Sequence, residues 1–296
     1  RPSQADYLRW TSQAAKPRQR QYHSPLIVSD GKQRFDGLRR HVGLPALIGP
    51  YGRTEALERI VGQHAGIFEK PGLALEVSAA GGDTQAFAAV LGGSADFAIG
   101  DATMVQMSRE QGGPGVVVGT VVQRAHYFGV SKNLEPMSQP AEFAGLTIVT
   151  SPEPNTNFSV AKRMLESADL TIGEDAEILQ VNPGTEIGAM LAGQADMAIA
   201  YQPSVSSAVA QGAQVVFDFA SYVGPFCNTG IMVLPSTIEN DPEMVQALVT
   251  AFEEASRLTY ADPDFAKEVA KKEFPDLDPA VVEAAIDAQL EYRIPA

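Results

Sequence analysis

Two similar stretches of the chain each end in polar residues that could bind a ligand. Residues 87–99 read FAAVLGGSADFAI and residues 187–199 read IGAMLAGQADMAI, so the two share Ala, Leu, Gly, Ala, Asp, Ala and Ile at matched places. Asp101 and Thr103 follow the first stretch, and Tyr201 follows the second. Carboxylate and hydroxyl groups form hydrogen bonds, and a tyrosine ring packs against a planar or apolar body. These residue types favour non-covalent capture of a ligand.

A helix and a strand in each stretch must position these residues. Gly93 and Gly193 stand where each apolar helix ends, because glycine readily adopts the left-handed conformation that terminates a helix. The short apolar run that follows is typical of a strand covered on both faces, and Asp96 and Asp196 are expected to fix the turn into it. Two such units predict two similar α/β lobes. Since open α/β sheets bind ligands beyond the carboxyl ends of their strands, we expect a cleft between the lobes.

Other loops that join a strand to a helix supply the remaining candidates. Backbone N–H groups and positive helix ends at such loops attract an anion or a carbonyl oxygen. The candidate ligand-binding residues are Tyr51, Gly52, Arg53, Thr54, Gly82, Asp83, Thr84, Asn155, Thr156, Asn157 and Asn228, together with the Asp101, Thr103 and Tyr201 already named. The alternatives are that Arg53 points to solvent and that Thr54 and Asp83 act only as helix caps. Residues 155–157 can likewise serve only as caps of the next helix.

The composition excludes several classes of partner. The 296 residues are 45% hydrophobic and 20% charged, which is typical of a globular protein with a sizeable core. The net charge of −14 argues against nucleic acid as a partner, because phosphate binding needs a basic surface. No stretch approaches the roughly 20 apolar residues of a membrane span, so we expect no direct membrane insertion.

Catalytic and metal-binding patterns are absent from the sequence. Cys227 is the only cysteine, and the histidines at positions 23, 41, 64 and 126 have no metal-ligand spacing. The sequence also lacks a nucleophile motif, a phosphate-binding loop and a dinucleotide-binding glycine motif. We therefore predict no catalytic residue, no metal site and no cofactor.

The order of the elements predicts one lobe interrupted by the other. Residues 1–43 show no sustained hydrophobic period and are interpreted as an N-terminal extension, with regular structure expected to begin near Leu44. Residues 44–124 and 225–296 are assigned to lobe 1, and residues 125–224 to lobe 2. Changes of pattern at the two boundaries predict the crossovers between the lobes.

Within this order, hydrophobic runs and helix-start signals place the individual elements. The expected strands are 44–49, 73–78, 116–122, 146–150, 178–181, 215–219 and 230–234. The expected helices are 55–65, 159–168, 204–212, 241–261, 263–273 and 279–291. In the first of these helices, Glu58 is expected to interact favourably with the positive helix end.

Four segments resemble the solute-binding proteins of ABC importers that have the type II periplasmic-binding-protein fold. They read HAGIFEKPGLALEV (64–77), GGDTQAFAAVLGGSADFAIGD (81–101), GLTIVTSPEPNTNFSVAKRML (145–165) and LAGQADMAIAYQP (191–203). The subgroup they resemble comprises taurine- and alkanesulfonate-binding, nitrate-binding and NMT1/THI5-like proteins. The resemblance implies a two-lobed α/β fold, with a ligand cleft between the lobes and hinge crossovers.

The resemblance also implies a function and partners. The protein is expected to be the substrate-binding component of an ABC importer that delivers a small organic solute to a membrane permease with its ATPase. It is expected to act as a monomer at a periplasmic or otherwise extracytoplasmic location, with a signal peptide outside this numbering. A sulfonate, a pyrimidine-like molecule or a more hydrophobic solute fits the candidate residues better than nitrate does, because Tyr201 offers aromatic surface and Arg53 is the only cationic candidate.

Two alternatives stay open at this point. The same cleft could serve a ligand-sensing protein that signals to another protein. Thiamine-pyrimidine synthase-like enzymes share the fold, but they carry a cysteine-rich motif, and this sequence has Cys227 alone.

Overall fold

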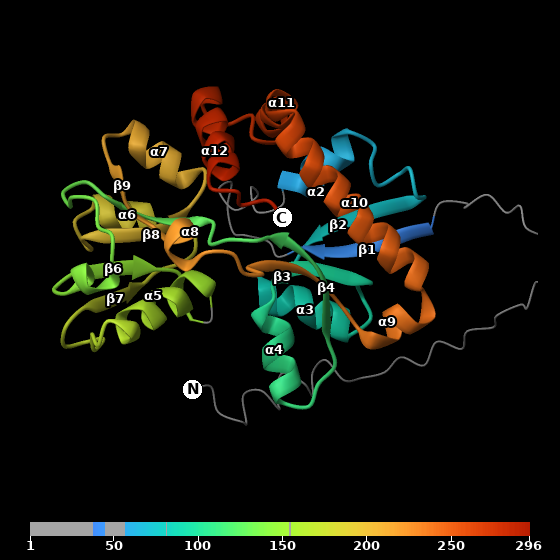
Figure 1. The fold of residues 1–296 in the computed structure, drawn as a ribbon, viewed down its shortest axis with the longest axis horizontal. Helices are drawn as coiled ribbons and strands as arrows, with labels where there is room; N and C mark the ends of the chain where they lie inside the picture. The colour runs from blue at the N-terminus through green and yellow to red at the C-terminus, as the bar shows by residue number, and fades with distance from the viewer. Residues whose placement is uncertain (1–37, 45–56, 81, 154) are drawn as a thin grey trace, which may run out of the picture.

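The computed structural model describes residues 38–44, 57–80, 82–153 and 155–296, which form two five-stranded sheets with helices on both faces (Figure 1). The first sheet has the order β2-β1-β3-β10-β4 and consists of β1 (Leu38–Leu44), β2 (Leu73–Ala79), β3 (Phe97–Asp101), β4 (Val116–Val122) and β10 (Thr229–Val233). The second has the order β7-β6-β8-β5-β9 and consists of β5 (Tyr127–Ser131), β6 (Thr147–Thr150), β7 (Glu177–Gln180), β8 (Met197–Tyr201) and β9 (Gln214–Asp218).

The two similar stretches of sequence form the centres of the two sheets. β3 is parallel to β1 and antiparallel to β10, and β8 is likewise parallel to β6 and antiparallel to β5. Gly93 and Gly193 follow the preceding helices with φ of 69° and 74°, which confirms the predicted left-handed helix ends. Both central strands are buried along almost their whole length, as expected for strands covered on both faces.

Helices surround both sheets. Those associated with the first sheet are α2 (Leu57–His64), α3 (Asp83–Leu91), α4 (Thr103–Glu110), α9 (Pro235–Asn240), α10 (Pro242–Ala261), α11 (Pro263–Glu273) and α12 (Pro279–Glu291). Those associated with the second are the short 3₁₀ helix η2 (Pro140–Phe143), α5 (Thr156–Ser167), α6 (Glu186–Leu191), α7 (Ser204–Ala210) and α8 (Phe219–Val223). Within the described ranges, none of the helices has the length and apolar character needed to cross a membrane.

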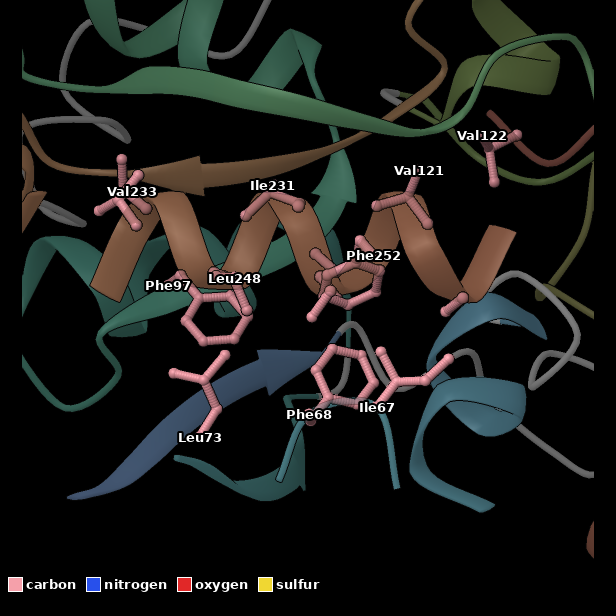
Figure 2. Close-up of a cluster of buried hydrophobic side chains, with 14 of the residues drawn as sticks. Ile67, Phe68, Leu73, Phe97, Val121, Val122, Ile231, Val233, Leu248 and Phe252 are labelled. Carbon is pink, nitrogen blue, oxygen red and sulfur yellow. The ribbon is translucent and has the colours of Figure 1, made fainter. Parts of the chain in front are cut away.

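The core of the first lobe lies between its sheet and α10. Leu248 and Phe252, one helical turn apart on α10, are buried with Phe97 and Ile231 of the sheet (Figure 2). Phe68 meets Phe252 edge to face, with ring centroids 5.1 Å apart. α3 and α4 cover the opposite face of this sheet in a second buried cluster.

The second lobe repeats this arrangement of a sheet between two layers of helix. α5 contributes Met164 and Leu165 to the cluster on one face, where they pack with residues of β5, β6 and β8. α6 and α7 contribute Met190 and Val205 to the cluster on the other face. Each sheet is therefore packed between helices on both faces, and this packing fixes the positions of its strand ends.

Two crossovers connect the lobes and are hydrogen-bonded to each other. The chain passes from β4 to β5 through residues 123–126 and returns from α8 to β10 through residues 224–228. The Phe226 N–H donates to the Gln123 carbonyl at 2.9 Å, and the Asn228 N–H donates to the Val122 carbonyl at 3.0 Å. The C-terminal segment joins them, since the Gln123 N–H donates to the carbonyl of Ile294 at 3.0 Å. This ladder is the structural hinge between the lobes.

The element boundaries confirm some expectations and correct others. β4 and the helices α11 and α12 have the predicted bounds. β1 begins at Leu38, so regular structure starts before the expected Leu44. The prediction that a helix begins at Ser159 is wrong, because α5 begins at Thr156. The expected strand at 44–49 and the start of the first helix lie outside the described residues.

The lobe boundaries at 124/125 and 224/225 stay a prediction. Each boundary lies between two consecutive strands that belong to different sheets. All strands of the second sheet lie within residues 125–224, and all strands of the first sheet lie outside that range. This arrangement of the described residues agrees with the prediction that lobe 2 interrupts lobe 1 in the sequence.

Candidate ligand-binding cleft

A small cavity of about 20 Å³ lies where the two lobes face each other. It is lined by Asp83, Asp101, His126, Asn155, Thr156, Tyr201, Asn228 and Thr229. These residues come from the carboxyl ends of β3 and β8, the starts of α3, α5 and β10, and both crossovers. The volume is enough for about one water molecule, so the lobes are in close contact in this structure.

Asp101, at the end of β3, is held by its own loop and by the opposite lobe. Its Oδ1 accepts hydrogen bonds from the backbone N–H and the hydroxyl of Thr103, at 2.9 and 2.7 Å. Its Oδ2 accepts a hydrogen bond from the hydroxyl of Thr156 on α5. The carboxylate is largely buried. It therefore forms a direct polar contact between the two sides of the cleft.

The amino end of α5 points its first residues at this cavity. Asn155 is the N-cap residue, but its side chain makes no capping hydrogen bond to the helix and donates instead to the Pro152 carbonyl at 2.8 Å. The positive end of this 12-residue helix faces the cleft, and of its first-turn N–H groups that of Phe158 is already bonded, at 2.9 Å, by Asn157 Oδ1. The structure places Thr156 and Asn157 inside the first turn of the helix and not in the loop that precedes it.

Asn157 anchors the start of α5 to the second sheet of its own lobe. The side chain is fully buried, and its Nδ2 donates to the Ile199 carbonyl at 3.2 Å and to the Ser151 hydroxyl at 3.3 Å. Ser151 in turn donates to Glu186 Oε1 at 2.6 Å, and burial raises the pKa of the Glu186 carboxyl. This network fixes the start of α5 against β8, so that Thr156 stays opposite Asp101.

Aromatic rings form one wall of the cleft. The Tyr201 ring lies 4.9 Å from the His126 ring and 5.6 Å from the Tyr127 ring, measured between centroids. Tyr127 is fully buried, and burial together with the negative charge of Asp101 raises the pKa of its phenol. The rings provide a surface against which a planar or apolar body can pack.

Asn228 presents an amide to the cleft from the return crossover. Asn228 is 3% exposed, and its Nδ2 has no hydrogen-bond partner among the residues that the structure describes. A buried donor without a partner costs about 1–3 kcal/mol, which a ligand with an acceptor atom would recover. Asn228 therefore favours a ligand that carries a carbonyl, sulfonate, carboxylate or ring-nitrogen acceptor.

Asp83, the first residue of α3, completes the polar lining. Its Oδ1 accepts the backbone N–H of Asp101 at 2.9 Å, and a Cβ atom at Gly100 would come within 2.5 Å of the same oxygen. Glycine at position 100 thus lets α3 approach the end of β3. Asp83 orders the Asp101 loop in addition to lining the cavity.

The remaining predicted residues lie beside the cavity or beyond the described part of the chain. Gly82 immediately precedes α3, Thr84 is exposed and its hydroxyl lies 3.7 Å from the Met104 sulfur, and Thr103 holds Asp101. Tyr51, Gly52, Arg53 and Thr54 lie outside the described residues. Ligand contact by any of these residues stays a prediction.

Sequence reasoning missed two of the lining residues, His126 and Thr229. At the level of sequence His126 offers only the chemistry of a metal ligand without a matching partner, and Thr229 carries no motif of its own. His126 lies in the first predicted crossover and Thr229 directly follows the second, which is the one signal in the sequence that could have identified them. Elsewhere, Asp196 accepts the Thr147 N–H at 2.8 Å, which confirms its expected role at the turn into β8.

Among the residues described, no group of three or more His, Cys, Asp or Glu side chains is positioned to hold a metal ion. The lining of the cavity is suited to hydrogen bonding and to aromatic packing.

This architecture defines a two-lobed protein of the periplasmic-binding-protein type II class. A family model described as NMT1/THI5 like matches residues 54–266, and the chain belongs to this family. Among curated proteins, none matches the chain.

Solved structures share the fold at low sequence identity. The periplasmic aliphatic sulphonate binding protein SsuA from Escherichia coli is similar with a TM-score of 0.70 and 17% identity, over 84% of this chain and 82% of that one. The alkanesulfonate-binding protein SsuA from Xanthomonas axonopodis pv. citri, bound to MOPS, has a TM-score of 0.67 and 17% identity, over 84% and 83%. The periplasmic nitrate-binding protein NrtA from Synechocystis PCC 6803 has a TM-score of 0.63 and 15% identity, over 82% and 68%.

Proposed function

We propose that this protein is the solute-binding component of an ABC-type importer, which captures a small organic solute in the cleft between its lobes. Membership of the NMT1/THI5-like family and the shared fold with sulfonate- and nitrate-binding proteins support this function. Capture by two lobes needs a hinge and a ligand site that both lobes build, and the paired crossovers and the cavity between the lobes support these two requirements.

The observation that carries the proposal is the contact between Thr156 and Asp101 across the cleft. Asp101 ends β3 of the first sheet, whereas Thr156 begins α5, which packs on the second sheet. In the described part of the chain, the crossovers and the C-terminal segment provide backbone hydrogen bonds where the lobes join. Ligand pockets usually measure about 300–1,000 Å³, whereas this cavity measures about 20 Å³. The lobes must therefore separate to admit a solute, and hinge closure then surrounds it.

The chemistry of the lining favours an organic solute with both donor and acceptor groups. Asp83 and Asp101 accept hydrogen bonds, Asn228 offers a donor, and the rings of Tyr201 and His126 offer aromatic surface. Within the described residues, no lysine or arginine lines the cavity, which disfavours a bare inorganic anion such as nitrate. A sulfonate with an organic body, a pyrimidine-like molecule or a more hydrophobic solute with a polar end satisfies this lining.

The same function sets the location and the partners. A binding protein of an importer works outside the cytoplasm, as a monomer that passes its solute to a permease coupled to an ATPase. The solute leaves chemically unchanged, so we propose no enzymatic turnover. A ligand-sensing role would use the same cleft and is distinguished by the absence of a permease that accepts the loaded protein.

A solute screen by thermal unfolding tests the proposal. Sulfonates, aminopyrimidines and small neutral aromatic molecules are each added to the protein, and a ligand at one hundred times its Kd should stabilise the folded state by about 2.7 kcal/mol. Mass spectrometry of the recovered solute should find it unchanged. A chemically altered product, or the absence of stabilisation by all organic solutes while nitrate stabilises, would contradict the proposal.

A further inference from the structure

A second and larger cavity lies in the first lobe, away from the cleft. It measures about 180 Å³ and is bounded by β4, β10, α10, the start of α2 and the C-terminal segment. Its lining is Glu58, Gly119, Thr120, Val121, Ile231, Val249, Phe252, Glu253, Ser256 and Ala296, and it shares no residue with the cavity between the lobes. Figure 2 shows Val121, Ile231 and Phe252, which belong to three neighbouring elements of this region.

A buried carboxyl lines this otherwise mostly apolar cavity. Glu58 is 2% exposed, and its Oε1 has no hydrogen-bond partner among the residues that the structure describes. Burial raises the pKa of Glu58 to about 8, although backbone N–H groups at Glu58 and Ala296 act in the opposite direction. The sequence alone predicted only that Glu58 interacts favourably with the positive end of its helix. A charged or neutral carboxyl kept in such surroundings is costly unless something satisfies it.

None of the described residues that line the cavity supplies a cationic side chain to Glu58. Glu253, at the edge of the cavity, is also acidic and forms an exposed ion pair with Arg257 at 2.6 Å. Ser256 donates its hydroxyl to the Ala296 carbonyl and so is already engaged. The apolar side chains of Val121, Val249 and Phe252 would contact the body of a ligand, while the carboxyl would face its charge.

We propose that this cavity is a second ligand site, which binds a small organic cation, an alkyl or cyclic amine, through the Glu58 carboxylate. The amine N–H groups donate to Oε1, and the hydrocarbon body fills the apolar part of the cavity. The volume is below the roughly 300–1,000 Å³ of most ligand pockets, so the occupant is a compact molecule. The net charge of −14 raises the local concentration of cations around the protein.

Binding must be accompanied by release of a proton. With a pKa of about 8, roughly nine in ten Glu58 carboxyls are protonated at pH 7, and an ammonium ion stabilises the ionised form. Of the other groups nearby, Tyr260 on α10 stays protonated at pH 7, because burial and the charge of Glu58 raise its pKa to about 12. Arg124 and Arg293 also interact with Tyr260, and Glu253 is solvent-exposed. The proton released at pH 7 therefore comes from Glu58.

Calorimetry with cyclohexylamine, which is an ammonium ion at pH 7, tests the site. Titrations in two buffers of different ionisation enthalpy should report saturable binding with release of nearly one proton per amine. Cyclohexanol, the neutral analogue, should bind at least about tenfold more weakly. Absence of amine binding, equal binding of the alcohol, or binding without proton release would each overturn the proposal.

Three variants make the assignment specific to Glu58. Glu58→Gln keeps the shape but removes the charge, and should weaken amine binding by roughly 30-fold or more and abolish proton release. Val249→Phe fills the cavity from its partly buried wall, and should also abolish amine binding while leaving Glu58 in place. Glu291→Gln, an exposed control on α12, should bind like the wild type. Retained amine binding in the Val249→Phe protein would overturn the site even if Glu58→Gln failed to fold.

Discussion

The hydroxyl of Thr156 donates a hydrogen bond to the carboxylate of Asp101, and the two residues belong to different lobes. Asp101 is fixed on its own side by Thr103 and by the nearby Asp83, and Thr156 is fixed by the buried network beneath α5. This polar contact across the cleft adds to the packing of α12 on α7 and of Tyr292 on Phe128, and it acts as a latch between the two sides. This contact exists only when the lobes are closed, and its removal should favour the open form.

Thr156→Val removes the hydroxyl with little change in shape and should weaken solute binding by about 1–2 kcal/mol, or roughly 5–30-fold, because closure loses a hydrogen bond to a charged group. Small-angle scattering should report a larger radius of gyration for this variant without solute. Thr250→Val, at an exposed position on α10, is the matched control. Unchanged scattering and affinity in Thr156→Val would show that the contact does not hold the lobes together.

Tyr201→Ala should weaken binding of an organic solute by about 1–3 kcal/mol, because the ring that faces the cavity would no longer pack against the solute body. Tyr201→Phe keeps the ring and should retain most of the affinity. Tyr222→Ala, an exposed tyrosine outside the cavity, should leave affinity unchanged. Calorimetry on the three variants decides the question, and equal affinities throughout would remove Tyr201 from the site.

Asn228→Leu should make the protein more stable and its solute binding weaker. The substitution removes a buried amide donor without a partner in the described residues, so the free energy of unfolding should rise by about 1–3 kcal/mol. The solute loses its hydrogen bond to the same donor, so its affinity should fall. Denaturant unfolding and calorimetry measure the two effects, and a loss of both stability and affinity would indicate a structural role alone.

Glu58 should make the free energy of unfolding depend on pH. Its folded-state pKa of about 8 lies above the ordinary value of 4.5, so between these values the folded protein binds more protons than the unfolded chain. Stability contributed by this difference is present below about pH 5 and is lost as the pH rises to 8, at up to about 1.4 kcal/mol per pH unit. Glu58→Gln should flatten the profile, whereas Glu291→Gln should not. Parallel profiles of the wild type and Glu58→Gln between pH 5 and 8 would refute the assignment.

Sequence pattern identified the parts of the fold that depend on local signals. The repeated helix–glycine–strand units were correctly predicted because Gly93 and Gly193 end helices and the runs that follow are apolar throughout. The start of α5 was misplaced because Asn155, Thr156 and Ser159 are all favourable N-cap residues, and the sequence does not state which one is used. β1 was placed too late because its stretch, LRRHVGL, is charged and is stabilised as a strand by its pairing with β2 and β3.

The candidate cleft was predictable only where a residue ends a recognisable strand. Asp101 and Tyr201 follow the two similar stretches, and both line the cavity. His126 and Thr229 reach it because the crossovers bring distant segments together, which local pattern does not encode. Glu58 is the strongest case, since the same first-turn position suits a solvated acid on an exposed helix, and only the packing of α10 and the C-terminal segment buries it.

The position of β10 in the first sheet has a consequence for how the protein is made. β10 lies between β3 and β4, yet it is synthesised after all five strands of the second sheet. While a ribosome translates the intervening chain, the edges of β3 and β4 that will pair with β10 are unpaired. Unpaired strand edges are sites at which other chains can add and aggregate. The second sheet contains every one of its strands in a continuous stretch and can complete itself first. All strands of the second sheet are thus available for pairing before Thr229 is synthesised, whereas the first sheet can be completed only afterwards.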